Sequence, residues 1–178
     1  TNLDVVDIDG AVDMASTLQV DGAITSSSAA TITTADNNPQ MTLVSTDADA
    51  NVGPVLKLYR NSSSPADNDL LGRIQFTGED DAGNENTFAR VNVIATDVSN
   101  GSEDARMEFA PAVADDFTPT MSLTSGNVGI GTTSPARELH LSATTPRFRL
   151  EDSDGGYSEI SGSGGHLTLS ADGGASQS

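Results

Sequence analysis

The chain has 178 residues, of which 35% are hydrophobic and 4% aromatic, and 26 acidic against 8 basic residues give it a net charge of −18. A typical globular domain is about 45–50% apolar, so this composition disfavours one large core within a monomer. The acidic charge argues against binding to phosphate backbones, the absence of cysteine excludes disulfides, and no apolar run approaches the ~20 residues of a membrane span. We therefore expect no nucleic-acid partner, no membrane insertion and no cofactor.

A short repeat occupies the first 35 residues. Asp9-Gly10-Ala11-Val12 recurs as Asp21-Gly22-Ala23-Ile24, and each unit resembles two short apolar strands around an Asp-Gly turn. A lone two-stranded unit is marginal in water, whereas units stacked along an axis and wrapped with identical chains can bury their apolar side chains. We expect residues 1–35 to form a shaft of β-repeats, similar to a β-helix or β-spiral.

Apolar and polar residues alternate along most of the remaining chain, which is the pattern of half-buried strands. The clearest examples are Leu56-Lys57-Leu58, Ile74-Gln75-Phe76, Val91-Asn92-Val93, Met107-Glu108-Phe109 and Leu167-Thr168-Leu169. The one helical indication is Ser134-Pro135-Ala136-Arg137-Glu138, a single turn at best. The chain is therefore predicted to be all-β, with about six strands in a module at 36–123, small sandwich-like modules and an elongated form.

A strand that begins with proline occurs three times. Pro39-Gln40-Met41-Thr42-Leu43, Pro119-Thr120-Met121-Ser122-Leu123 and Pro146-Arg147-Phe148-Arg149-Leu150 each place two large apolar residues two positions apart. Such residues share one face of a strand, and the first position of a strand tolerates the missing N–H of proline. We interpret these segments as one strand type that begins successive modules.

The run Gly126-Asn127-Val128-Gly129-Ile130-Gly131-Thr132-Thr133-Ser134-Pro135, followed by Leu139-His140-Leu141, resembles a connector common in phage tail fibres and related trimeric attachment proteins. Residues 72–80, 89–93 and 101–109 are similar to a small β module found in those fibres. The resemblance implies a homotrimer in the virion, with other tail proteins and a host cell-surface receptor as partners. In many of these fibres an intramolecular chaperone domain follows the connector. No counterpart of that domain is present here, so we expect a fragment or a trimmed fibre.

The connector, residues 124–141, also allows a physical interpretation. Val128 and Ile130 alternate with Gly129 and Gly131, so their side chains share a face and the other face is bare backbone. Around a threefold axis, Val128, Ile130, Leu139 and Leu141 are our candidates for the trimer core. The alternative is an ordinary glycine-rich hairpin within one monomer.

The sequence contains only weak motifs for metal binding or catalysis. Asp47-Ala48-Asp49-Ala50-Asn51-Val52-Gly53 begins like a calcium loop, but its glycine falls one place late and its twelfth position is Leu58 in place of glutamate. Paired carboxylates could hydrolyse glycosidic bonds, but with 26 acids some pair always lies close, and no tryptophan offers a sugar platform. His140 and His166 have no spacing typical of a metal site. We expect no enzymatic activity.

The terminal module, residues 142–178, holds the densest group of potential contact residues. Arg147, Arg149, Tyr157 and His166 are our candidates for receptor contact, because arginine and aromatic residues are enriched at recognition surfaces. The alternative is that Phe148 is a core residue and that the arginines pair with Glu151, Asp152 or Glu159.

These observations lead us to expect a structural component of a phage tail fibre. It would project and support host-receptor attachment as a homotrimer outside the cell, and a glycan is one candidate for the receptor. A cellular surface adhesin or extracellular filament subunit is the alternative, and a polysaccharide-degrading spike is the third hypothesis.

Overall fold

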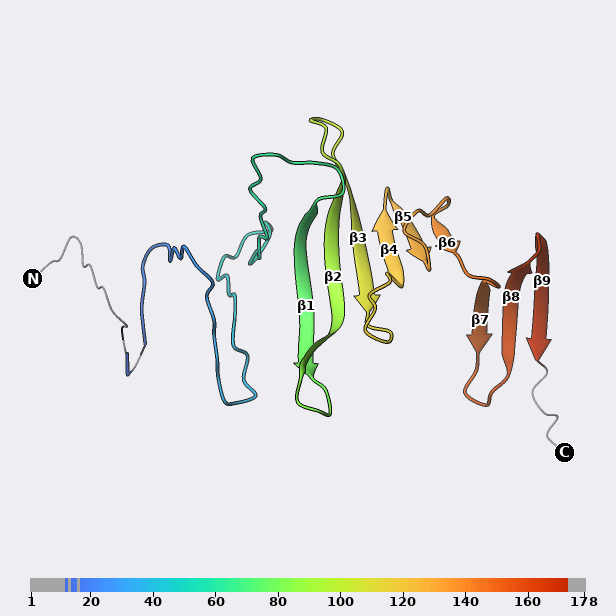
Figure 1. Ribbon diagram of the computed structural model, residues 1–178, viewed down its shortest axis with the longest axis horizontal. Coiled ribbons are helices and arrows are strands. Elements are labelled where there is room, and N and C mark those ends of the chain that lie inside the picture. The colour runs from blue at the N-terminus through green and yellow to red at the C-terminus, as the bar shows by residue number, and fades with distance from the viewer. Residues whose placement is uncertain (1–11, 13, 16, 173–178) are drawn as a thin grey trace, which may run out of the picture. The chain divides into compact units, whose positions relative to one another are not determined.

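The computed structural model describes residues 12, 14, 15 and 17–172 (Figure 1). The chain divides into two compact units, Thr1–Val55 and Leu56–Ser178. The described part of the first unit contains no strand or helix. Its local order comes from short turns, in which the carboxylate of one Asp accepts the backbone N–H two residues later, as Asp36 does from Asn38 and Asp49 from Asn51.

The predicted β-repeat shaft is therefore not formed as hydrogen-bonded strands in the described part of residues 1–35, and its first Asp-Gly turn lies outside the described residues. The strands predicted at Met41–Leu43 and at Leu56–Leu58 are also wrong for the single chain. The physical reason is common to both segments. A strand requires a neighbour that accepts and donates its backbone hydrogen bonds, and alternation of side chains supplies no such neighbour.

The described part of the second unit contains no helix and has two sheets, which confirms the all-β class (Figure 1). The strands of the first sheet, in their order across it, are β1 (Leu70–Glu79), β2 (Glu85–Asp97), β3 (Asp104–Pro111), β4 (Met121–Thr124), β5 (Asn127–Ile130) and β6 (Leu139–Leu141). The second sheet comprises β7 (Arg147–Glu151), β8 (Tyr157–Ser163) and β9 (His166–Asp172). Each sheet taken by itself is a single layer, so the expected sandwich-like layering is not formed within either one.

Antiparallel pairing joins β1 through β5, and β6 then lies parallel to β5. The β4–β5 hairpin turns at Ser125 and Gly126, whose φ angles of 50° and 78° are those of the two-residue turn that matches strand twist. The boundary that we placed between 123 and 124 falls within this hairpin. Residues 36–123 contribute four strands instead of about six, and residues 124–141 continue the same sheet.

Two of the three proline-led segments begin strands. Pro119 precedes β4 and Pro146 precedes β7, so in both places proline stands just outside the hydrogen-bonded ladder. The segment Ser134–Glu138, in which we saw a possible helical turn, is an irregular loop between β5 and β6. No helix among the described residues is long and apolar enough to cross a membrane.

Candidate interaction faces

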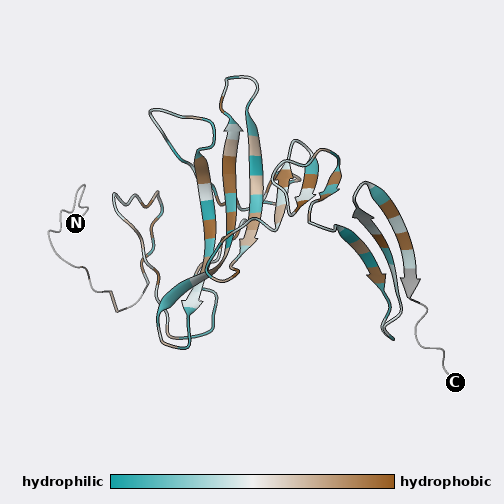
Figure 2. Ribbon diagram, turned by 45° about the vertical axis from the view of Figure 1, so that its right-hand side comes forward, coloured by the Kyte–Doolittle hydropathy of each residue, from teal (hydrophilic) through white to brown (hydrophobic). Residues whose placement is uncertain are grey.

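One face of the six-stranded sheet is apolar from edge to edge. Cross-strand partners share a face, so the printed register assigns side chains directly. Ile74 pairs with Val91, which pairs with Phe109, which pairs with Met121, which pairs with Ile130. The apolar face consists of Ile74, Phe76, Ala89, Val91, Val93, Met107, Phe109, Met121, Leu123, Val128, Ile130, Leu139 and Leu141. None of its members is charged, and Figure 2 shows the alternation of apolar and polar bands along β1 to β3.

Nothing in the described part of the chain fully buries the apolar face. Phe76 and Leu139 are each 56% exposed, and Ile74 is 47% exposed. The described hydrophobic residues that are buried are only Ile94, Ala95 and Ala110, which are too few to form a core for a chain of this size. The apolar face therefore has the composition of a protein interior and the exposure of a surface.

The four candidates for the trimer core all lie on this apolar face. Val128 pairs with Leu139 and Ile130 pairs with Leu141 across the parallel β5–β6 ladder. The backbone of the connector forms an intrachain hairpin, as our alternative interpretation stated, and that hairpin presents Val128 and Ile130 on the uncovered face. Gly129 and Gly131 accommodate the chain's own backbone, since an added Cβ would collide with the carbonyl oxygen of Thr132 or Ser142 respectively.

The opposite face of the sheet is polar and is partly covered by the chain's own loops. Ser122, which is completely buried, donates its hydroxyl to the carbonyl oxygen of Thr132 at 2.7 Å. Phe117 lies against the guanidinium of Arg90, whose carbon is 3.6 Å from the ring centroid. The polar side chains of this face, which we call the polar face, are those of Arg73, Gln75, Arg90, Asn92, Arg106, Glu108, Ser122, Thr124 and His140. The buried Ile94 and Ala110 lie on the same face, as the cross-strand partners of Arg106 and Arg90.

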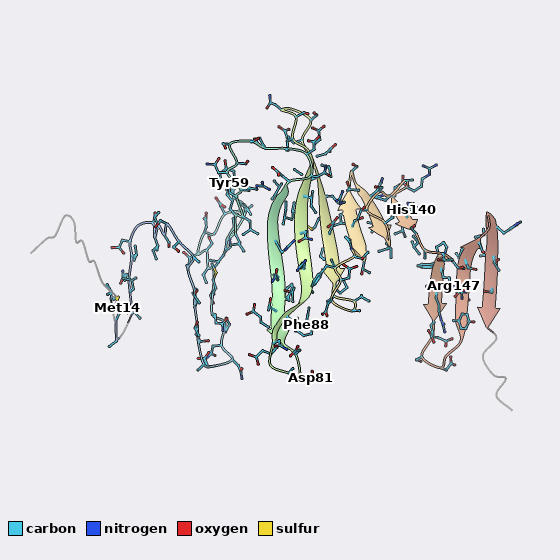
Figure 3. The ribbon with its side chains drawn as sticks, viewed as in Figure 1. Met14, Tyr59, Asp81, Phe88, His140 and Arg147 are labelled. Carbon is cyan, nitrogen blue, oxygen red and sulfur yellow. The ribbon has the colours of Figure 1, made fainter. Side chains whose placement is uncertain are left out.

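A partly buried ion pair lies in the middle of the polar face. Arg106 donates through Nε to Glu108 Oε1 at 2.7 Å, and Glu108 is only 7% exposed. At the sheet's edge, His140 on β6 accepts the backbone N–H of Ala136 through Nδ1 at 3.2 Å (Figure 3). This contact holds the 131–138 loop and gives His140 a structural role.

The four candidates for receptor contact share one face of the second sheet. Arg147 pairs with Ser161, Arg149 with Glu159, and His166 with Ser163, which places Arg147, Arg149, Tyr157 and His166 on the same side. Both arginines are paired: Arg147 with Glu159 at 3.2 Å and Arg149 with Glu151 at 3.0 Å. The guanidinium of Arg149 also lies 3.9 Å from the ring centroid of Tyr157. The pairing that we considered as the alternative is present.

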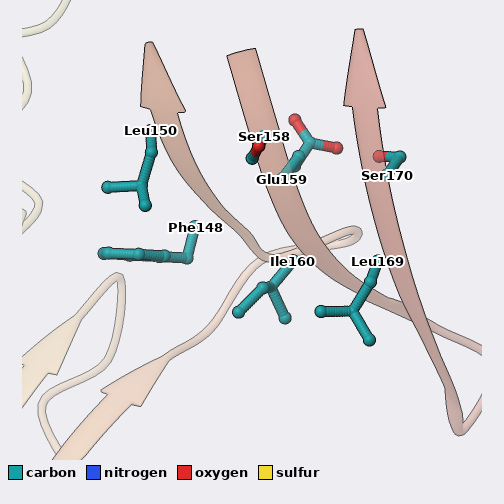
Figure 4. A pocket seen from close by; sticks show the side chains of 7 residues that line it. All are labelled: Phe148, Leu150, Ser158, Glu159, Ile160, Leu169 and Ser170. Carbon is teal, nitrogen blue, oxygen red and sulfur yellow. The ribbon is translucent and has the colours of Figure 1, made fainter.

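The other face of the second sheet is apolar and forms a shallow hollow. Phe148, Ile160 and Leu169 lie in one cross-strand row, and Leu150 lies beside Phe148 on the same side (Figure 4). Phe148 is 47% exposed, so it is a core residue only if another surface covers it. The second sheet thus repeats the design of the first, with one charged face and one uncovered apolar face.

Aspartate side chains in the acidic loops accept hydrogen bonds that stabilise turns. Asp80, in the β1–β2 turn, accepts from the side-chain amide and the backbone N–H of Asn84, and the pKa of Asp80 is lowered chiefly by these two hydrogen bonds. In the candidate calcium loop, Asp47 accepts the N–H of Asp49 and Asp49 that of Asn51. Among the described residues, no group of three or more acidic or histidine side chains is arranged to hold a metal ion.

The complete apolar face was not predicted from the sequence. The signal was present, because each strand contributes an alternating pair such as Ile74 and Phe76 or Met107 and Phe109. Alternation alone does not say that all these pairs point to the same side, since that depends on the register of every hairpin. The bulges at Phe76/Thr77 and at Ala95/Asp97 shift that register, and no sequence pattern predicts where they occur.

The described residues define an all-β protein in which each of the two sheets has one apolar face that the chain leaves largely exposed. No family model matches the chain. A search of curated proteins likewise finds no match.

Proposed function

We propose that this chain is a structural subunit of a phage tail fibre that projects and supports host-receptor attachment as a homotrimer. The apolar face of the six-stranded sheet carries the proposal, because it requires a covering layer. Other copies of the same chain are the natural cover. Because each chain has a net charge of −18, two copies repel each other over most of their surfaces. Close association therefore requires a surface without charge, such as the apolar face.

The size of the apolar face supports association. Its six most exposed side chains, at about 200 Å² each when free, present roughly 500 Å² of apolar surface. At about 25 cal/mol per Å², burial of this area contributes about 12 kcal/mol per chain. Three chains bury three such faces in two association events, each of which costs on the order of 4–15 kcal/mol. The free energy gained by burial therefore exceeds or matches the free energy cost of association, even before the half-buried residues of the apolar face are counted.

The role in attachment rests on the resemblance of the Gly126–Pro135 connector to phage tail fibres. In that role the chain acts mechanically. A stiff assembly presents three copies of a weak receptor site at once, and the multivalency raises avidity without any new contact.

The test is the molar mass in solution, measured by light scattering, for the unchanged chain and for a matched pair of variants. We expect a trimer of about three times 18.2 kDa. Phe76→Ser on the apolar face should shift the mass toward the monomer, whereas Gln75→Ser, one residue away on the polar face, should leave the trimer intact. A monomeric unchanged chain at micromolar concentration would contradict the proposal.

A further inference from the structure

Two arginines on the polar face have no acidic partner among the residues that the structure describes, in a chain that carries 26 acidic residues. Within the described residues, ion pairs occupy Arg60, Arg106, Arg147 and Arg149. Arg73 and Arg90 form none, and they lie on adjacent strands of the same face. In so acidic a chain, two neighbouring guanidiniums without an ion pair among the described residues concentrate positive charge on one part of the sheet.

The register arranges four side chains into a compact group, which we call the arginine patch: Arg73, Gln75, Arg90 and Asn92. Arg73 pairs with Asn92 and Gln75 pairs with Arg90, so the two arginines are diagonal neighbours about 7–8 Å apart. A carboxylate with a short polar substituent spans such a distance.

Contacts within the chain hold the arginine patch in place and leave some of its hydrogen-bond donors and acceptors without a partner in the described residues. Arg73 donates through Nε to Asn92 Oδ1 at 2.8 Å, which fixes the guanidinium plane, and no further hydrogen bond of Arg73 occurs within the described residues. Gln75 donates to Thr87 Oγ1 at 2.7 Å, so its Oε1 remains available as an acceptor. Arg90 is braced against Phe117, and its Nε is buried without an acceptor in the described part of the chain.

We propose that the arginine patch binds a saccharide that bears a carboxylate. A guanidinium fork matches a carboxylate in a bidentate way, which accounts for the arginines. The free amide N–H groups of Asn92 and the free oxygen of Gln75 suit sugar hydroxyls, which both donate and accept. A densely charged polymer such as a nucleic acid suits the patch less well, because the net charge of −18 repels it.

This inference rests on the proposed function, since a trimer closed through the apolar faces leaves the polar faces directed outward. Arg73 and Gln75 are exposed in the single chain. The loops that cover the polar face contact β2 at Arg90 and β4 at Ser122, so they leave the β1 end of the patch open to solvent. The patch itself lies within one sheet, so it does not require a second copy.

Saturation-transfer NMR on the full chain tests the proposal with methyl glucuronide as the probe and methyl glucoside as the uncharged control. We expect saturation transfer to the glucuronide, competition by free acetate, and little transfer to the glucoside. Arg73→Gln should weaken glucuronide binding about tenfold, the loss that follows from one charge-assisted hydrogen bond. Arg137→Gln removes the same charge from an exposed arginine whose one hydrogen bond within the described residues goes to the carbonyl oxygen of Ala136. This variant should bind the glucuronide as the unchanged chain does.

Equal binding of the two sugars, or equal weakening by Arg73→Gln and Arg137→Gln, would overturn the assignment. Arg90→Gln is a second variant, used only if its circular dichroism matches that of the unchanged chain, and it should weaken binding as Arg73→Gln does. The molar mass of each sample separates this result from the proposed function. A monomer that binds glucuronide contradicts the trimer alone, whereas a trimer without glucuronide binding contradicts the arginine patch alone.

Discussion

Ser122 on β4 donates its hydroxyl to the carbonyl oxygen of Thr132, and this bond anchors the loop between β5 and β6 to the polar face. Ser122 is completely buried, so the bond is shielded from water. The partner on the neighbouring strand is Gly129, whose lack of a side chain makes room for the loop. The parallel pairing of β6 therefore depends on a serine and a glycine that lie opposite each other.

We predict that Ser122→Ala lowers the free energy of unfolding by about 1–3 kcal/mol, because it leaves the Thr132 carbonyl buried without its donor. Urea denaturation followed by circular dichroism measures the change. Ser158→Ala, at an exposed strand position on the second sheet, is the control and should change stability by less than about 0.5 kcal/mol. Equal effects of the two substitutions would mean that the Ser122 bond contributes nothing.

The second prediction compares two glycines of the connector. Gly129→Ala should destabilise the sheet strongly, because the added Cβ collides with the Thr132 carbonyl oxygen and lies 2.8 Å from Ser122 Oγ. Gly126→Ala adds its Cβ in open space and suffers only from the φ of 78°, which costs roughly 1–2 kcal/mol. Thermal unfolding of the two variants should therefore give the larger drop in Tm for Gly129→Ala. The reverse order would contradict the close approach of the loop.

The third prediction concerns pH and the turn between β1 and β2. Hydrogen bonds from the side chain and backbone of Asn84 hold the pKa of Asp80 below its ordinary value of 3.8. A carboxyl group whose pKa is lower in the folded chain than in the unfolded chain stabilises the fold at any pH above its ordinary pKa. This stabilisation is lost as the pH falls through the ordinary pKa and then through the lowered pKa of the folded chain. Asp80→Asn should thus lower Tm at pH 7 and have progressively less effect toward pH 2.

Asp81→Asn is the control for the pH experiment, since Asp81 is exposed and accepts no hydrogen bond within the described residues. Its Tm should follow that of the unchanged chain across the whole range. An NMR titration of the Asp80 carboxyl carbon provides an independent check, because its midpoint should lie below the ordinary value of 3.8. A Tm difference between Asp80→Asn and the unchanged chain that stays constant with pH would exclude the carboxylate as the cause.

The fourth prediction concerns residues 17–60, where many apolar side chains are exposed in the single chain, including Ile24, Val44 and Leu58. If other copies supply the missing strand partners, as the proposed trimer requires, backbone amides of this segment should exchange hydrogen slowly in the assembly. In chains dissociated by Phe76→Ser they should exchange rapidly. Hydrogen exchange with mass spectrometry measures both states, and the amides of β2 serve as a reference. Rapid exchange in an intact trimer would show that the segment has no partner there.

The sequence predicted strands well where a hairpin partner follows nearby. Ile74–Phe76, Val91–Val93, Met107–Phe109 and Leu167–Leu169 all lie in strands. It failed at Leu56–Leu58, where the same alternation has no strand beside it. Lys57 and Arg60 there make side-chain contacts instead, Arg60 with the carbonyl oxygen of Leu70 at 3.0 Å and Lys57 with the Tyr59 ring. Alternation is a local property, whereas a strand is a relationship between two segments.

The candidate sites illustrate the same limit. The candidates for the trimer core could be chosen from the connector because Val128 and Ile130 are close in sequence. The arginine patch could not be found this way, since Arg73 and Arg90 meet only through the register of β1 and β2. The patch is distinguished by the lack of an acidic partner for Arg73 and Arg90 within the described residues, and no pattern of spacing shows which carboxylates fold away from a given arginine.

The parallel pairing of β6 also determines where the chain leaves the sheet. Six strands that alternated in direction throughout would return the chain to the end at which β1 began. Because β6 runs in the same direction as β5, the chain enters the sheet at one end and departs from the other. Each sheet of this kind therefore moves the polypeptide forward by one strand length, which is the connectivity that a protein needs if it is to grow along an axis by adding modules.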